Sequence, residues 1–462
     1  MLNKEKIPEF SASLRGRVVQ PGDADYESSR KVYNGMIDRH PRLIVFCRDV
    51  ADVMQCVNFA REHSLLLAVR GGGHNGGGLG ICDEGLVIDL SGLNGIRVDV
   101  KAGTARVEGG CTWGDVDHAT HAFGLATPSG IISTTGVGGL TLGGGLGHLT
   151  RKCGLAVDNL VEADVVLADG TLVTANAEQH PELYWALRGG GGNFGVVTSF
   201  LFRLHAVSTV VAGPTFWSLE QAGDVMRWYR NFILSAPEDL NGFFAYMTVP
   251  AVDPFPKELQ GKKVCGVVWC YAGPADQADA VFKPVAKFGP PLMHGVQPMP
   301  YPTLQGAFDG LYPKGDQWYW RADFVTELSD AAIAEHEKFG PQMPTPQSTM
   351  HMYPIDGVAH RVKSGDTAFS YREANWGTVF AGVSGNSADV PAISAWSKNY
   401  WNALHPHSSG GAYVNMMMDD EGDERIRASY RDNYPRLAAA KKRYDPDNLF
   451  RVNQNIRPEQ AP

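Results

Sequence analysis

A glycine-rich segment near the start of the chain constrains its fold more than any other feature. Residues 65–69 are apolar and predict a buried strand, and the eleven residues that follow, 70–80, are mostly glycine. Such tracts occur where the backbone must approach another group closely, and consecutive free N–H groups form a concavity for anions such as a diphosphate. We therefore expect a cofactor cradle here, with His74 pointing into the same cavity to tether the cofactor. The alternative is a glycine-rich surface turn with a solvated histidine.

The spacing of these glycines does not match the common phosphate-binding loops. The segment reads Arg-Gly-Gly-Gly-His-Asn-Gly-Gly-Gly-Leu-Gly. It is neither Gly-x-Gly-x-x-Gly opening a helix nor Gly-x-x-x-x-Gly-Lys-Ser/Thr. Neither the Rossmann nor the P-loop mechanism is therefore expected.

Three further blocks decide between the cradle and the surface turn. They lie at residues 136–148, 188–197 and 443–456. Together with the first block, and in this order, they resemble the flavoprotein family with the vanillyl-alcohol-oxidase-type FAD-binding domain. Within that family they resemble the bacterial form of the berberine-bridge-enzyme-like branch, over nearly the whole chain. The resemblance implies an α+β, two-domain flavoprotein, whose substrate domain is an antiparallel sheet backed by helices.

The composition of the chain changes near residue 206 and marks a domain boundary. Residues 206–425 hold most of the prolines, tryptophans and methionines. We expect residues 1–205 to form the main part of the FAD-binding domain and residues 206–425 the substrate-binding domain. Residues 426–462 are predicted to begin with one helix, 426–444. The resemblance implies that this last segment returns to the FAD domain.

Local patterns place several elements within the FAD-binding part. Apolar residues at helical spacing predict a helix over residues 50–63, and a second helix is predicted over 113–121. Short apolar runs at residues 86–90, 96–100 and 104–107 predict three strands, which we expect to form a meander.

The resemblance assigns the cofactor and its contacts. In this family the histidine of Arg-Gly-Gly-Gly-His bonds covalently to the flavin 8α-methyl group, which implies covalent FAD on His74. Such a link withdraws electrons and raises the flavin potential. Some members carry a second link through a cysteine just before the second glycine block, but Ile132 lies near that place, so a single link is implied. The residues expected to contact FAD are Arg70, Gly71, Gly72, Gly73, His74, Asn75, Leu79, Gly80, Pro128, Ser133, Thr134, Gly136, Gly138, Gly139, Leu142, Gly143, Gly144, Gly147, Val196, Tyr413, Asn453 and Asn455.

The base that takes the substrate proton is open between two places. One is the predicted strand 350–353, where alternation puts His351 and Tyr353 on one face. The other is the segment around Tyr413, where several alcohol-oxidising relatives carry a later tyrosine as the proposed base. Here that position is Met416, which cannot take a proton. We therefore expect His351 to be the base, with a pKa that shifts little from neutrality. Tyr353 and Tyr413 are further candidates, and a structural role for His351 is the alternative.

Several other side chains are candidates for the wall of the substrate site. Met350, Met352 and residues Met416 to Met418 would make an adaptable apolar wall, with plain core packing as the alternative. Tyr246 and Trp376 are weaker candidates. Cys153 is either a small residue that widens the site or a plain core thiol.

Composition excludes several classes of function. The net charge of −9 argues against nucleic acid as a partner, and no apolar run is long enough to cross a membrane. The first fifteen residues contain no apolar stretch of the kind found in signal peptides. The seven cysteines are scattered without a Cys-x-x-Cys pair, so we expect no metal site. We expect them to be reduced thiols in a cytoplasmic protein.

The family resemblance implies an FAD-dependent oxidase. It is expected to take hydride from a small aromatic, amine or natural-product substrate to flavin N5 and to be reoxidised by O2 with release of H2O2. Its partners would be that substrate and O2, and the protein would be a monomer or homodimer. The alternatives are a sugar or alcohol oxidase of the same fold, a dehydrogenase that reacts poorly with oxygen, and a non-catalytic flavin-binding protein.

Overall fold

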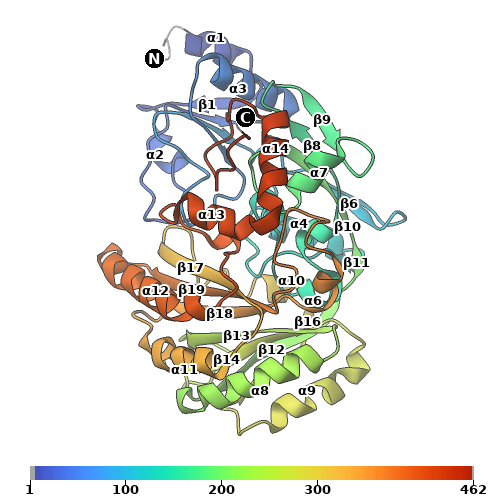
Figure 1. Cartoon of the computed structure of the whole chain (residues 1–462), viewed down its shortest axis with the longest axis vertical. Helices are drawn as coiled ribbons and strands as arrows, with labels where there is room; N and C mark the ends of the chain where they lie inside the picture. Colours follow the sequence, from blue (N-terminus) through green and yellow to red (C-terminus); the bar gives the residue numbers. More distant parts are fainter. Residues whose placement is uncertain (1–5, 460–462) are drawn as a thin grey trace.

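The chain folds into two lobes stacked along the long axis of the molecule (Figure 1). The computed structural model describes residues 6–459. The outer ends of the predicted segments 1–205 and 426–462 lie outside the described residues. The same holds for part of the N-terminal stretch in which no signal peptide is predicted. Mixed helix and sheet, with an antiparallel sheet in one lobe, confirms the predicted α+β class.

The first lobe contains two sheets. The apolar runs that precede and follow helix α3 (Val50–Glu62) contribute parallel strands to the smaller sheet. Helix α3 begins after Asp49, whose carboxylate caps it by accepting the Asp52 N–H. The smaller sheet has the strand order β1 (Arg17–Val19), β2 (Leu43–Phe46), β4 (Leu86–Asp89), β3 (Leu67–Arg70). The larger has the order β5 (Ile96–Asp99), β6 (Thr104–Glu108), β10 (Val196–Arg203), β8 (Leu160–Val166), β9 (Leu172–Ala175).

The predicted meander of three strands is wrong. The strand at 86–89 pairs in parallel with β2 and β3, whereas the strands at 96–99 and 104–108 pair with each other in the larger sheet. The predicted helix over 113–121 is present as α4 (Trp113–His121), because Thr112 and Asp115 form a capping box at its start. The remaining short elements of this lobe are α1 (Lys6–Ala12), α2 (Tyr26–Ser29), α5 (Val137–Leu142), α6 (Thr150–Cys153), α7 (Pro181–Leu187) and the pair β7 (Leu125–Ala126) with β11 (His205–Ala206).

The second lobe is one antiparallel sheet with helices on one face (Figure 1). Its strand order is β15 (Met293–His294), β12 (Thr209–Trp217), β14 (Lys263–Tyr271), β13 (Leu240–Thr248), β18 (Thr349–Pro354), β19 (Trp376–Ser384), β17 (Gln317–Val325), with β16 (Gln297–Pro300) also pairing with β12. The covering helices are α8 (Ala222–Ser235), α9 (Ala278–Lys287), α11 (Asp330–Phe339) and α12 (Val390–Leu404), while the short α10 (Tyr301–Gln305) contacts α4 of the first lobe. The opposite face of the sheet is left for the first lobe.

The two faces of β18 divide its side chains. Met350 and Met352 are buried in the core between the sheet and its helices, together with Tyr246 and Trp376. Because strand side chains alternate, His351 lies on the opposite face, toward the first lobe. The four core residues therefore do not form the wall of the site, contrary to the prediction.

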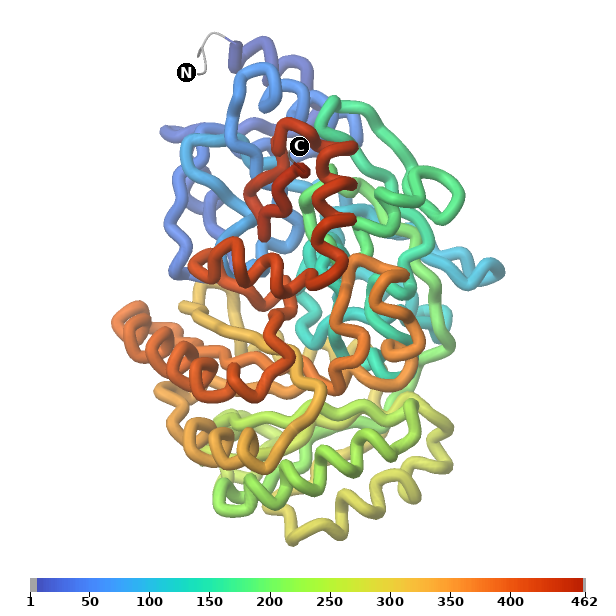
Figure 2. The backbone as a smooth tube through the Cα atoms, in the orientation of Figure 1, coloured from blue at the N-terminus to red at the C-terminus, as the bar shows by residue number. Residues whose placement is uncertain are grey.

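The C-terminal segment returns to the first lobe, but not as one helix. It forms α13 (Gly422–Tyr430) and α14 (Tyr434–Tyr444), separated by Arg431, whose φ of 49° is incompatible with a continuous helix. In Figure 2 this red segment runs back among the N-terminal elements, and α14 packs on α7. A fully buried ion pair between Lys441 and Asp445, 2.6 Å apart, fixes the turn that follows.

Among residues 6–459, no helix has both the length and the apolar character needed to span a bilayer. Within the same range no cluster of three or more histidine, cysteine or acidic side chains is arranged to hold a metal ion.

Candidate active site

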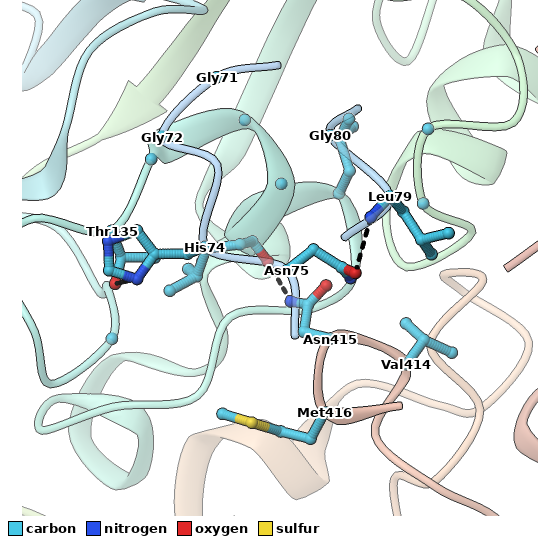
Figure 3. A pocket seen from close by; sticks show the side chains of 18 of the residues that line it. Gly71, Gly72, His74, Asn75, Leu79, Gly80, Thr135, Val414, Asn415 and Met416 are labelled. Carbon is cyan, nitrogen blue, oxygen red and sulfur yellow. Dashed lines mark hydrogen bonds between the residues drawn. The ribbon is translucent and has the colours of Figure 1, made fainter. Parts of the chain in front are cut away.

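A cavity of about 340 Å³ lies between the two lobes. This volume falls within the range of roughly 300–1,000 Å³ that is usual for small-molecule sites. Its floor is made by the three glycine blocks of the first lobe, and its roof by strands β17, β18 and β19 with the segment after Tyr413. Figure 3 shows part of this lining, with Gly71, Gly72, His74, Asn75, Leu79, Gly80 and Thr135 from the floor and Val414, Asn415 and Met416 from the roof.

The glycines of the floor serve two different purposes. Gly72 and Gly136 lie so close that a Cβ on either would collide with the backbone of the other, so the first two glycine blocks touch through bare main chain. Gly139 and Gly192 are different, because a Cβ on either would meet no protein atom within 4 Å. Both line the cavity, so a side chain there would project into the space available to a cofactor.

His74 sits at one end of the floor with its ring held on two edges and one face. Its Nε2 lies 3.1 Å from the Thr134 hydroxyl and its Nδ1 3.5 Å from the Thr135 hydroxyl. The ring of Tyr33 stacks on it with centroids 3.9 Å apart and an angle of 16°. Burial, with a contribution from the positive charge of Lys314, lowers the pKa of His74 to about 4 against the opposing effect of Thr134. The imidazole is therefore neutral at neutral pH.

Several buried polar atoms around the floor have no partner among the described residues. Arg70 donates from Nε to Asp89 at 2.5 Å, but its Nη1 is buried and unpaired. Asn453 donates from Nδ2 to the carbonyls of Gly192 and Phe450, while its Oδ1 and that of Asn455 accept nothing. Unpaired buried donors and acceptors are costly, so they mark places where a polar ligand is expected. Together with the open glycines they fit a nucleotide cofactor such as FAD.

The roof carries a hydrogen-bonded pair of titratable residues. His351 Nδ1 and the Tyr353 hydroxyl are 2.7 Å apart, and both side chains line the cavity. Burial lowers the pKa of His351 to about 3 and raises that of Tyr353 far above its usual value. The expectation that His351 keeps a pKa near neutrality is therefore wrong, because the sheet and the first lobe remove it from water.

Tyr413 enters the cavity beside the second glycine block. Its phenolic oxygen accepts the Gly145 N–H at 2.9 Å and the Asn415 Nδ2 at 2.8 Å. Burial raises the pKa of this phenol, and the two donated hydrogen bonds act in the opposite direction. Met416 lines the cavity next to it as an apolar wall residue.

Most of the predicted site residues come together in this one cavity. Those that line it are Arg70, Gly71, Gly72, Gly73, His74, Asn75, Leu79, Gly80, Gly136, Gly138, Gly139, Leu142, Val196, His351, Tyr353, Tyr413 and Asn453. The predicted residues outside its lining are Pro128, Ser133, Thr134, Gly143, Gly144, Gly147 and Asn455. Thr134 nevertheless contacts His74, and Ser133 bonds to Asp309 of the second lobe through its backbone N–H at 3.0 Å. Cys153 is buried in a separate core cluster, so the core-thiol alternative holds for it.

An aromatic wall was missed in the sequence. Tyr33 and Tyr312 line the cavity together with two tryptophans of β17, Trp318 and Trp320. Alternation along residues 317–325 puts the two tryptophans on one face, which is the signal that could have identified them. Tyr33 lies far from the four blocks in sequence, and nothing in its local pattern indicates its position.

Comparisons with known proteins show which family and fold this chain shares. A family model described as FAD binding domain matches residues 41–176, and one described as Berberine and berberine like matches residues 412–457. An FAD-linked oxidoreductase of Dictyostelium discoideum is 33% identical, over 98% of this chain and 97% of that protein. The (R)-6-hydroxynicotine oxidase of Paenarthrobacter nicotinovorans is 29% identical, over 97% of this chain and 98% of that protein. The crystal structure of 6-hydroxy-D-nicotine oxidase from Arthrobacter nicotinovorans superposes with a TM-score of 0.86 at 26% identity, covering 97% of this chain and 99% of that one.

Proposed function

The chain belongs to the berberine-bridge-like family of FAD-linked oxidoreductases, and from this premise we propose that it is an oxidase of small, uncharged organic molecules. When bound, FAD supplies a hydride acceptor at flavin N5. The observation that carries the proposal is the arrangement of one cavity. Its floor offers open glycines and unpaired polar atoms to a flavin nucleotide, and its roof sets the Tyr353–His351 pair and an aromatic wall opposite that floor.

His74 is proposed to hold FAD covalently, through the flavin 8α carbon. Attachment requires an imidazole nitrogen that is not protonated, and the lowered pKa of His74 provides one at neutral pH. Only Ile132 occupies the place of a second tether, and it lines the cavity as an apolar residue. Protein denatured in acid should therefore stay yellow, and digestion should yield one flavin-bearing peptide, containing His74. Release of all flavin from the wild-type protein into the supernatant contradicts this link.

The charge of the cavity supports an uncharged substrate. Within the described part of the chain, no carboxylate and no lysine lines it, and the one guanidinium, of Arg70, is paired with Asp89. His74 and His351 are neutral because their pKa values are lowered. A charged substrate would lose its hydration without gaining a counter-ion, which costs several kcal/mol. An amine would accordingly enter as the free base.

Matched ligands test this selection. A panel of aromatic alcohols, phenols, cyclic amines and sugars is screened anaerobically for bleaching of the flavin absorbance. For the best substrate, an analogue with a quaternary ammonium or a carboxylate on the same skeleton should lose at least about 100-fold in kcat/KM, which corresponds to about 3 kcal/mol. Equal kcat/KM for the charged analogue contradicts the proposal, and a sugar as best substrate favours the alternative of a carbohydrate oxidase.

Tyr353 and His351 are proposed to remove the substrate proton together. At neutral pH neither is a strong base alone, because burial raises the pKa of the phenol and lowers that of the imidazole. The phenolic oxygen can accept the substrate proton while its own proton passes to His351 Nδ1 across 2.7 Å, so no phenolate accumulates. Tyr413, whose oxygen already accepts two N–H groups, is the alternative acceptor.

Single and double variants distinguish these acceptors. Tyr353→Phe and His351→Asn should each slow flavin reduction in stopped flow by about 10²–10⁴, the usual effect of removing a general base. The double variant should be no slower than about either single one, because the two residues act as a unit. Tyr319→Phe is the matched control, since Tyr319 is on the same sheet but bonds to Asp420 outside the cavity. A large effect of Tyr413→Phe with little effect of Tyr353→Phe would transfer the role to Tyr413.

Reaction with oxygen completes the proposal and separates oxidase from dehydrogenase. The reduced enzyme is mixed with air-saturated buffer, and the return of flavin absorbance and the yield of H2O2 are followed. One H2O2 per substrate oxidised, with reoxidation faster than turnover, is the expected result. Slow reoxidation in air with rapid reoxidation by an artificial acceptor would indicate a dehydrogenase.

A further inference from the structure

Tyr33 belongs to a short segment that joins the flavin loop to the second lobe. Its backbone N–H donates to Gly73 O at 3.0 Å, and its carbonyl accepts the Gly315 N–H at 2.9 Å. Its hydroxyl donates to Tyr312 O at 2.8 Å. One residue of the first lobe is thus bonded to the residue before His74 and to the loop 312–316 that precedes β17.

Asn34 makes the same connection through its side chain. Nδ2 donates to Gly76 O at 2.7 Å and to Trp318 O at 2.9 Å, while Oδ1 accepts the Trp318 N–H at 3.0 Å. Tyr33 and Asn34 are 4% and 1% exposed. These bonds anchor the backbone of residues 33–34, and the hydroxyl bond to Tyr312 anchors the far end of the Tyr33 ring.

This anchored ring covers one face of the His74 imidazole. The two rings are nearly parallel at 3.9 Å, and the Thr134 and Thr135 hydroxyls lie on the two nitrogen edges. The two hydroxyls hold the nitrogen edges of the ring. The stack with Tyr33 covers one face and so opposes any tilt of the imidazole toward that side.

We infer that Tyr33 is a positioning residue for the covalent attachment of FAD, holding the His74 ring in the plane from which its nitrogen bonds to the flavin. The inference rests on the proposed link through His74. In that step an imidazole nitrogen bonds to the 8α carbon, the carbon loses one proton and the imidazole loses its N–H proton. The two electrons left on the flavin pass to O2, which with two protons becomes H2O2. The hydrogen bonds of Tyr33 to the second lobe make attachment depend on both lobes being docked.

The test compares rates of attachment in the full-length protein. Flavin-free protein from a riboflavin-starved host is mixed with FAD in air, samples are quenched in acid, and covalent flavin is read as in-gel fluorescence. Tyr33→Leu should slow attachment about 2- to 13-fold, the range that a stacked aromatic pair contributes. Tyr33→Phe, which keeps the ring and loses only the hydroxyl, should stay within about twofold of the wild type.

Tyr26 supplies the matched control. It is also a buried tyrosine, its hydroxyl also donates to a backbone carbonyl at 2.8 Å, and it packs in a core cluster away from the cavity. Tyr26→Leu should therefore attach FAD at the wild-type rate. Non-covalent FAD affinity is measured separately by placing Tyr33→Leu in the His74→Ala background. Tyr33→Leu should change this affinity by a smaller factor than it changes the attachment rate. If Tyr33→Leu does not fold, Tyr33→Met provides the same comparison.

The outcomes separate the two claims. Equal attachment rates for wild type and Tyr33→Leu, or equal slowing by Tyr26→Leu, overturn the role of Tyr33 and leave the link through His74 intact. A wild-type protein that never retains flavin in acid overturns the link, and the inference with it. Slowing by Tyr33→Leu with rescue by Tyr33→Phe supports both.

Discussion

Buried histidines make the stability of this protein depend on pH in a way that the structure predicts. His148, His336 and His351 all have pKa values lowered to about 3 by burial, with the charge of His407 adding to the effect at His336. An unfolded chain protonates them near pH 6.5, whereas the folded protein does not. The three neutral histidines therefore add to the free energy of unfolding in full above pH 6.5, and this contribution is lost as the pH falls toward 3. Going from pH 8 to pH 5 costs roughly 2 kcal/mol for each, or about 6 kcal/mol for the three.

Asp117 acts in the opposite direction. Burial raises its pKa to about 7, and within residues 6–459 its carboxylate accepts one side-chain hydrogen bond, from Gln305 Nε2 at 3.2 Å. The folded protein therefore binds this proton more tightly than the unfolded chain, and stability is lost as the pH rises toward 7. Between pH 8 and pH 5 this carboxyl returns roughly 2–3 kcal/mol, so the net loss expected at pH 5 from these four groups is about 3–4 kcal/mol.

Urea unfolding of the flavin-loaded protein at pH 8 and pH 5, followed by tryptophan fluorescence, measures the difference. Asp117→Asn removes the opposing contribution and should widen the difference to about 6 kcal/mol, whereas His336→Phe should narrow it by about 2 kcal/mol. His118→Gln, an exposed position on α4, is the control and should leave it unchanged. A protein that is equally stable at both pH values, or an Asp117→Asn variant with a smaller difference, would refute the reasoning.

Two further predictions concern the cofactor floor. Lys441→Met leaves the Asp445 carboxylate buried without its counter-ion and the Asn193 carbonyl without the Lys441 ammonium, so unfolding should become easier by about 3–5 kcal/mol. Lys441→Met/Asp445→Asn should recover part of this stability, and a loss below about 1 kcal/mol in urea would show that the pair is not needed. Gly139→Ala places a methyl group toward the cavity from within helix α5, so FAD affinity should fall. Because alanine favours a helix more than glycine does, the flavin-free protein should gain up to about 1 kcal/mol of stability. The control is Gly310→Ala, which is equally unobstructed but outside the cavity and should leave FAD affinity unchanged.

Elements that depend on local chemistry could be predicted from the sequence. Helix α3 starts at its Asp49 cap and α4 at its Thr112 capping box, close to the predicted positions. The four blocks identified the family and the floor of the cavity, because glycine at a close backbone approach is a local requirement.

What the sequence could not provide were relations between distant residues. The three-strand meander was wrong because the partners of β4 come from elsewhere in the chain. The helix over 426–444 was wrong because nothing in its apolar pattern signals the positive φ at Arg431. The pKa of His351 depends on burial by two lobes, and the stack of Tyr33 on His74 joins positions 41 residues apart, so neither is written in a local pattern.

The return of the C-terminal segment sets the order in which this protein can acquire its flavin. Phe450, Val452, Asn453 and Gln454 line the cavity, and the Lys441–Asp445 pair bonds to the Phe450 backbone at the start of this stretch. A ribosome releases these residues after both lobes have been synthesised, so a nascent chain presents an incomplete floor. Loading is therefore a step that follows translation, and a fragment that stops at residue 205 should emerge colourless even if its own sheets fold.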